Sequence, residues 1–178
     1  MKAILIAAYW ALAASLGSGQ TLKLDSLDRL AAKASESVNV TLDGALLRMA
    51  SGFLSDGDKD EAEVKKLVAG LKSILVRSFE FKNTGEYLES DVEAIRAQLR
   101  NVGWKKIVEV RSKVDGDADI YLHTEADRIM GMALISAEPR ELTVVNIDGT
   151  LDIQGLRKIA GNFGIPGSVR KKIDGKTK

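Results

Sequence analysis

The sequence predicts an α+β protein in which helices pack on one face of a mainly antiparallel sheet. The first half of the chain has apolar residues three and four apart, which is helical spacing, whereas the second half alternates apolar and polar residues between turn signals. The expected order is N-terminal helices, then a strand, a helix, three antiparallel strands and a last helix. With 178 residues, 45% of them hydrophobic and 29% charged, the chain has the length and composition of one folded domain.

Three apolar patterns predict helices in the first half. Their core-facing sets are Leu24, Leu27, Leu30, Ala31 and Ala34; Leu42, Leu46, Met49 and Phe53; and Val64, Leu67, Val68 and Leu71. The second helix is expected to begin through Asp43, a good N-cap residue, and to close near Gly52. Between the first two helices, residues 37–41 are rich in β-branched side chains, which indicates an edge strand or an extended link.

The second half is expected to form the sheet. Strands are predicted at residues 74–82, 107–114, 119–124, 130–137 and 141–148, with a helix at residues 91–100 that Gly103 is placed to stop. Consecutive hairpins make the last three strands antiparallel, and the helix is a crossover that ties in the first strand. Asp148-Gly149 is expected to end the sheet, and a last helix presents Ile153, Leu156, Ala160 and Phe163.

Residues 1–19 have the order of a secretory signal peptide: a positive start at Lys2, an uncharged apolar run, and small residues before a cleavage site placed after Gly19. The apolar run is too short to span a bilayer comfortably, so we expect no stable membrane insertion after cleavage; the alternative is an uncleaved anchor or a buried first helix. Residues 20–168 are then a single domain, and residues 169–178 a basic tail that we expect to be disordered. These features predict an exported protein, periplasmic or extracellular.

Two stretches and one aromatic residue carry a resemblance to a known family. The stretches are residues 71–81 and residues 141–152, the second followed by Leu156, Ile159 and Ala160, and Trp104 precedes a strand. With the signal peptide in front, the chain resembles the domain-of-unknown-function family 4252. The resemblance implies an exported bacterial protein without an assigned activity, encoded near sigma-factor and anti-sigma genes and so linked to envelope signalling. It supplies no catalytic residues, and the absence of cysteine separates this chain from the lipid-anchored members.

Composition argues against several classes of function. The formal net charge is +1, which gives no global field to attract nucleic acid. The absence of cysteine excludes disulfides, thiolate catalysis and zinc fingers, and a lone histidine, His123, argues against a multi-histidine metal site or a proton relay. We expect His123 to face solvent from a strand. We therefore predict no catalytic residues, no cofactor and no nucleic-acid partner.

One acidic group leaves metal binding open. The carboxylates of Asp56, Asp58 and Asp60 alternate as in the first half of a calcium loop. Glu61 and Leu67 stand where that loop needs a glycine and a bidentate glutamate, so these aspartates are only weak calcium candidates. A capped helix N-terminus explains the same acids.

A second acidic group leaves hydrolysis open. Glu86, Glu89, Asp91 and Glu93 are close enough in sequence to supply the carboxylate pair of a hydrolase. Acids before and inside the start of a helix are also what capping alone predicts. The sequence therefore favours an exported, non-enzymatic binding protein of the bacterial cell envelope. Its expected partner is another envelope protein, bound through an exposed sheet edge or the helical N-terminal half; a hydrolase and a weak calcium-binding module remain the alternatives.

Overall fold

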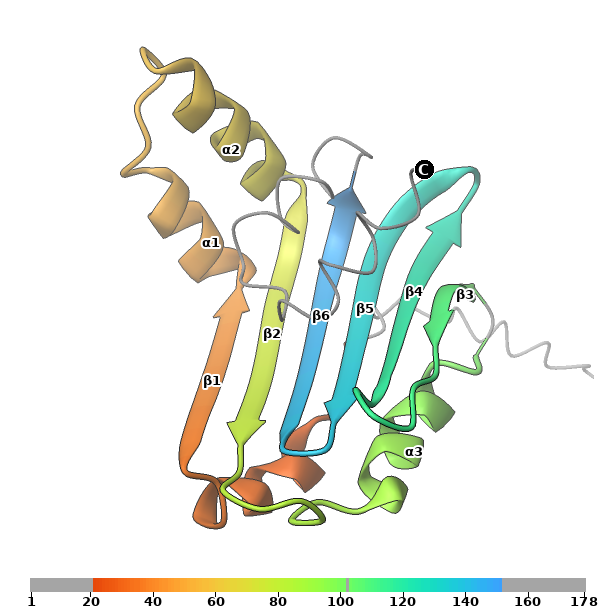
Figure 1. The fold of residues 1–178 in the computed structure, drawn as a ribbon. Helices are drawn as coiled ribbons and strands as arrows, with labels where there is room; N and C mark the ends of the chain where they lie inside the picture. Colours follow the sequence, from red (N-terminus) through yellow and green to blue (C-terminus); the bar gives the residue numbers. More distant parts are fainter. Residues whose placement is uncertain (1–20, 102, 152–178) are drawn as a thin grey trace, which may run out of the picture.

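The computed structural model describes residues 21–101 and 103–151, which form a six-stranded sheet with four helices (Figure 1). The elements in chain order are the 3-10 helix η1 (Asp25–Ala32), β1 (Glu36–Asp43), α1 (Gly44–Ser51), α2 (Lys59–Ala69), β2 (Leu71–Glu80), α3 (Glu89–Gln98), β3 (Trp104–Val110), β4 (Asp117–Glu125), β5 (Arg128–Glu138) and β6 (Glu141–Leu151). The predicted signal peptide, last helix and basic tail lie outside the described residues.

The strands are ordered β1-β2-β6-β5-β4-β3, and every neighbouring pair is antiparallel. The predicted α+β class is therefore confirmed, and residues 37–41 lie in an edge strand as one of the two expectations had it. Four strands follow α3, one more than in the expected order, because the predicted segments at residues 107–114, 119–124, 130–137 and 141–148 all pair in the sheet. The sheet does not end at Gly149: with a φ of +131° and the backbone of Gly70 and Leu71 packed against it, Gly149 lets β6 continue to Leu151.

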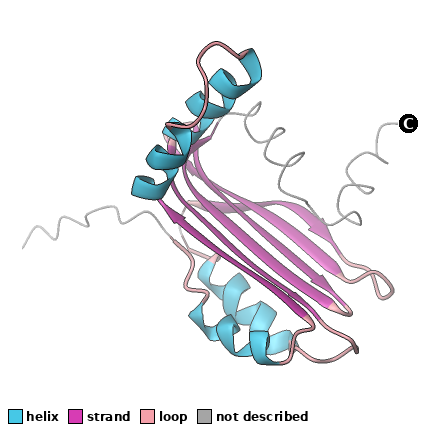
Figure 2. Ribbon diagram, turned by 90° about the vertical axis from the view of Figure 1, so that its left-hand side faces the viewer, coloured by secondary structure: helices cyan, strands magenta, loops and turns pink. Residues whose placement is uncertain are grey.

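One face of the sheet is covered by η1 and α3 (Figure 2). Leu27, Leu30, Val92 and Ile95 are at most 1% exposed there, and they pack with Phe79 and Val144 of the central strands. The first helix is a 3-10 helix. Its buried residues Leu27 and Leu30, together with the N-cap residue Leu24, are spaced by three and so line one edge of that tighter helix.

The opposite face carries a second apolar cluster at the end of the sheet where α1 and α2 lie (Figures 1 and 2). Leu47 of α1 packs there with Ile74, Ile147 and Leu151. The structure thus differs from the expectation that all helices cover one face. No helix of the described residues has the length and apolar character needed to cross a membrane.

The buried side of α1 is also not the predicted one. Asp43 caps the helix as expected, since its carboxylate accepts the amides of Ala45 and Leu46, each at 2.9 Å. That cap starts the helix directly at the end of β1, and the resulting rotation points Leu47 at the sheet. Three members of the expected core face are exposed instead: Leu46 is 44%, Met49 63% and Phe53 85% accessible.

Candidate functional site

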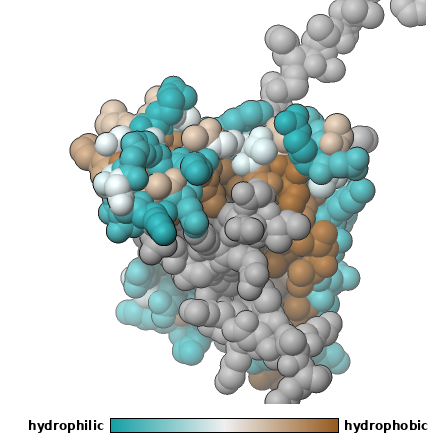
Figure 3. Space-filling view, turned by 90° about the horizontal axis from the view of Figure 1, so that it is seen from above, coloured by the Kyte–Doolittle hydropathy of each residue, from teal (hydrophilic) through white to brown (hydrophobic). Residues whose placement is uncertain are grey.

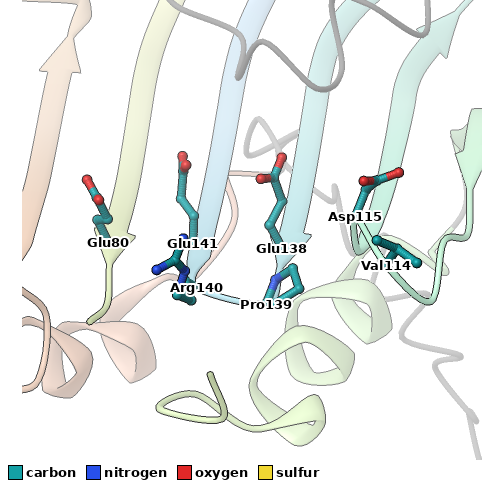
Figure 4. Close-up of a pocket in the computed structure, with 7 residues that line it drawn as sticks. All are labelled: Glu80, Val114, Asp115, Glu138, Pro139, Arg140 and Glu141. Carbon is teal, nitrogen blue, oxygen red and sulfur yellow. The ribbon is translucent and has the colours of Figure 1, made fainter. Parts of the chain in front are cut away.

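An acidic cavity of about 490 Å³ lies at the end of the sheet where β2 and β5 finish and β6 begins (Figure 4). Its lining consists of Glu80, Val114, Asp115, Glu138, Pro139, Arg140 and Glu141. Register explains the gathering of charge: Glu141 on β6 stands directly opposite Glu80 on β2 and Glu138 on β5. Figure 4 shows the carboxylates of these glutamates side by side and extending in the same direction.

The cavity raises the pKa of the Glu141 carboxyl. Burial is the main cause and the neighbouring charges of Glu138 and Glu80 add to it, while a hydrogen bond from the Thr143 hydroxyl opposes the rise. That hydroxyl lies 3.0 Å from Glu141 Oε1 and 2.7 Å from the Ser78 hydroxyl. A carboxyl that holds its proton to higher pH is the kind of group that general acid catalysis uses, so this cavity is the observation that bears most on the hydrolase alternative.

Sequence reasoning missed this cavity because Glu80 and Glu141 are brought together only by the β2–β6 pairing. The acids that it did single out for hydrolysis have other partners. Glu89 and Glu93 contact the Arg96 guanidinium at 3.1 and 2.9 Å, and Asp91 pairs with Arg29 and accepts the Leu88 amide. These carboxylates therefore hold α3 in place and do not form a free pair.

Arg96 is the centre of an ion network between α3 and β4. Its guanidinium is 8% exposed and lies 2.8 Å from Asp119 Oδ2 and 3.3 Å from Asp117 Oδ2. Asp119 is fully buried, and Arg111 and Lys106 approach its other oxygen at 2.8 and 3.3 Å. Burial acts to raise the pKa of Asp119, but hydrogen bonds and charge from Arg111 and Arg96 outweigh it, so the pKa is lowered. The network is best explained as a structural anchor.

Two of the three calcium candidates have protein partners. Both carboxylate oxygens of Asp56 lie 2.9 Å from Lys65 Nζ, and Asp58 accepts the Glu61 amide at 3.2 Å, which is the capping role. Asp60 lies in the first turn of α2. Within residues 21–101 and 103–151, no three His, Asp or Glu side chains are grouped so that they could hold a metal ion.

His123 is not the solvent-facing residue that we expected. Its side chain is 12% exposed and packs on Trp104, with 5.2 Å between the ring centroids. Gly103, expected to stop the preceding helix, lies beyond the end of α3 with a φ of +95°, and a side chain there would collide with the His123 ring. The contact between Trp104 and His123 therefore packs the start of β3 onto β4.

The clearest candidate for recognition is the exposed apolar stripe of α1, formed by Leu46, Met49 and Phe53. Leu46 and Met49 are one turn apart on the helix, and Phe53 follows in the turn after it. Seen from above, hydrophobic residues reach the surface among hydrophilic ones on the side of the molecule that carries α1 and α2 (Figure 3). The sequence pattern grouped these residues with Leu42 as the core-facing side of one helix, and that prediction is wrong: Leu42 lies in β1, and the other three are exposed.

Taken together, these elements define an α+β protein built on a single antiparallel sheet, with helices against both of its faces. The chain belongs to the family described as Domain of unknown function (DUF4252), whose model matches residues 32–159. The family resemblance of the sequence is thereby confirmed. No curated protein and no solved structure gives a significant match to the chain.

Proposed function

We propose that this chain is an exported, non-enzymatic binding protein of the bacterial cell envelope and that it binds another envelope protein. The observation that carries the proposal is the exposed stripe of α1. Phe53 and Met49 are large apolar side chains that remain 85% and 63% accessible. Aromatic and methionine side chains are enriched in protein interfaces, and their burial by a partner is favourable by about 25 cal/mol per Å².

The position of the stripe supports a docking role. Leu46 and Met49 lie on α1, which follows the end of β1 at the margin of the sheet, with α2 beyond it (Figure 1). Leu47, on the neighbouring side of α1, anchors the helix to Ile74 and Ile147. Leu46 and Met49 are therefore held on an anchored helix, with Phe53 in the turn that follows it, and this lowers the entropy that a partner must overcome to bind the helical part of the stripe. Export rests on the pattern of residues 1–19, and a role in envelope signalling rests on the family.

Crosslinking and capture from the native envelope fraction test the proposal. Met49→Ser and Phe53→Ser remove the stripe without touching the core, and we expect each to reduce recovery of the captured partner at least tenfold, corresponding to about 1.4 kcal/mol. The matched control is Ile107→Ser, because Ile107 is 56% exposed on β3, far from α1 along the sheet. Recovery that falls equally with Ile107→Ser, or that is unchanged by both stripe variants, contradicts the proposal.

Further arms of the same experiment separate the alternatives. Capture with and without calcium tests a calcium-binding module, since dependence on calcium would bring the Asp56 and Asp58 carboxylates back into consideration. Glu141→Gln tests the hydrolase alternative in a substrate screen. An activity that this variant abolishes without lowering the melting temperature would favour the acidic cavity as the functional site.

A further inference from the structure

The two edges of the sheet are not protected alike. β3, at one edge, carries Lys105 and Lys106 and has a register shift between Lys106 and Val108, and both lysine side chains and bulges discourage further strand pairing. β1, at the other edge, has no lysine, arginine or proline, and it pairs with β2 over all eight residues without a shift. Figure 1 shows β1 at the margin of the sheet with β2 as its strand neighbour. Among the described residues, β1 has β2 as its one strand neighbour, so its other side is an open pairing edge.

Hydrogen-bond alternation identifies the backbone groups that this edge presents. The Phe81 amide donates to the Arg140 carbonyl at 2.8 Å, so Phe81 and every second residue before it turn their backbone groups toward β6. The intervening residues of β2 turn toward β1, and their register partners are Glu36, Val38, Val40 and Leu42. The amides and carbonyls that point away from the sheet consequently belong to Ser37, Asn39, Thr41 and Asp43.

This edge is complementary to itself about Val40. A two-fold axis through that residue places Val40 opposite its own copy and Val38 opposite Leu42, which gives apolar pairs on one face of the sheet. On the other face, Asn39 meets Thr41 and Ser37 meets Asp43, so each outward backbone group faces another outward group. The register forms about six to eight hydrogen bonds and opposes no like charges. An axis through Asn39 is poorer because it sets Glu36 against Leu42.

Charge at the two ends of β1 fits the same register. Glu36 stands opposite Glu80 within its own sheet, which is an unfavourable pair. The axis through Val40 places Glu36 opposite Gly44 of the second copy. The Arg48 side chain of α1 lies over Gly44, with its Nη1 atom 3.3 Å from the position of a Cβ built there. This register therefore brings each Glu36 to the end of the pairing where the other molecule carries Arg48, so opposite charges meet there.

From these four observations we infer that two copies of this chain pair β1 with β1 in antiparallel fashion about Val40, so that one sheet continues across the dimer. The second copy is the occupant that the edge fits best, since backbone, side chains and end charges all match. The inference is independent of the α1 stripe, because it uses the outward backbone of β1 and the stripe uses side chains of the following helix.

Single cysteines test both the dimer and its register, because the chain contains no cysteine of its own. In the protein purified from its native envelope fraction, Val40→Cys places two thiols in a closely spaced non-hydrogen-bonded pair, which suits a disulfide. Asn39→Cys faces Thr41, which leaves its two thiols too far apart. We expect Val40→Cys to form a disulfide-linked dimer at least about ten times faster under mild oxidant. Faster linkage of Asn39→Cys would overturn the register.

Sedimentation of the same protein tests the backbone pairing. Asn39→Pro removes an outward amide without disturbing the β1–β2 ladder, so it is expected to shift dimer to monomer, whereas Asn39→Ala keeps the amide and the dimer. The inference is overturned if the wild type is monomeric and neither cysteine variant forms a disulfide-linked dimer. It is also overturned if Val40→Cys forms its disulfide with a different protein, because a strand of that protein would then occupy this edge. The β1 dimer and the docking role of the α1 stripe can fail separately, because Met49→Ser and Phe53→Ser should leave the Val40→Cys disulfide unchanged.

Discussion

Substitution of Asp119 by asparagine is the sharpest test of how α3 is held on the sheet. The Asp119 side chain is fully buried and lies 2.8 Å from Arg96 and 2.8 Å from Arg111. Asparagine preserves the shape and the oxygen that accepts one hydrogen bond, but it removes the charge. Arg96 would then remain 8% exposed with less compensation for its own charge.

The expected cost follows from this geometry. Removal of one partner from a buried ion pair costs about 3–5 kcal/mol, because the remaining charge has lost both water and its partner. Arg96 keeps contacts with Glu93 and Glu89, so we expect the lower end, about 3 kcal/mol. This is a large part of a total stability of about 5–15 kcal/mol. With a urea m-value of about 2 kcal/mol per M, the unfolding midpoint falls by about 1.5 M.

Glu109→Gln is the matched control in the urea titration. Glu109 contacts the same two cations, Lys106 at 2.8 Å and Arg111 at 2.7 Å, but its side chain is 53% exposed. Water screens exposed pairs, so this variant should leave the midpoint almost unchanged. The reasoning is refuted if both variants shift the midpoint equally, or if Asp119→Asn shifts it by less than the error of the fit.

The pH dependence of the same variant has a defined sign. The folded protein lowers the pKa of Asp119 below its ordinary value of 3.8, so the ionised carboxylate stabilises the fold. That contribution is fully present above pH 3.8 and is lost as the pH falls through the lower, folded-state value. The difference in unfolding free energy between wild type and Asp119→Asn should therefore be constant at neutral pH and shrink below pH 3.8.

Three further outcomes are expected. Glu141→Gln should raise the melting temperature at pH 7, with a gain in unfolding free energy on the order of 0.5 kcal/mol. The folded state raises the pKa of Glu141 above 4.5, so the ionised carboxylate is unfavourable there, and the gain should vanish below pH 4.5. Gly116→Ala should cost about 2 kcal/mol or more in urea unfolding, because φ is +87° and a strand carbonyl occupies the Cβ position, whereas Gly85→Ala, at φ +79° in open space, should cost less. Several millimolar calcium should leave the melting temperature unchanged, because Asp56 already pairs with Lys65.

Local chemistry allowed the boundaries of α1 to be predicted well. Asp43 has a short carboxylate that satisfies the first helical amides, and Gly52 follows the last turn, so both ends are fixed by residues within the segment. The 3-10 geometry of η1 was not predicted, since Leu24, Leu27 and Leu30 suit either an α-helix with Ala31 and Ala34 or a tighter helix. The structure buries the leucines and leaves Ala31 exposed.

The sequence alone could not predict which distant strands lie side by side in the sheet. The crossover from β2 carries the chain to the far edge at β3, and β6 returns to lie beside β2. No local pattern specifies that return, because each strand satisfies its own alternation wherever it pairs. The acidic cavity depends on it, since Glu80 and Glu141 become neighbours only in this register.

The α1 segment is where local pattern and tertiary structure disagree most. Its spacing predicted a helix with Leu46, Met49 and Phe53 toward the core, yet α1 buries Leu47 while Met49 and Phe53 stay exposed. Such conflicts reduce the stability of an isolated chain, and proteins tolerate them mainly at functional sites. The β3 edge, with its lysines and bulge, shows that this sequence can protect an edge. The exposed side of α1 and the unprotected edge of β1 are therefore the two surfaces on which the proposals above rest.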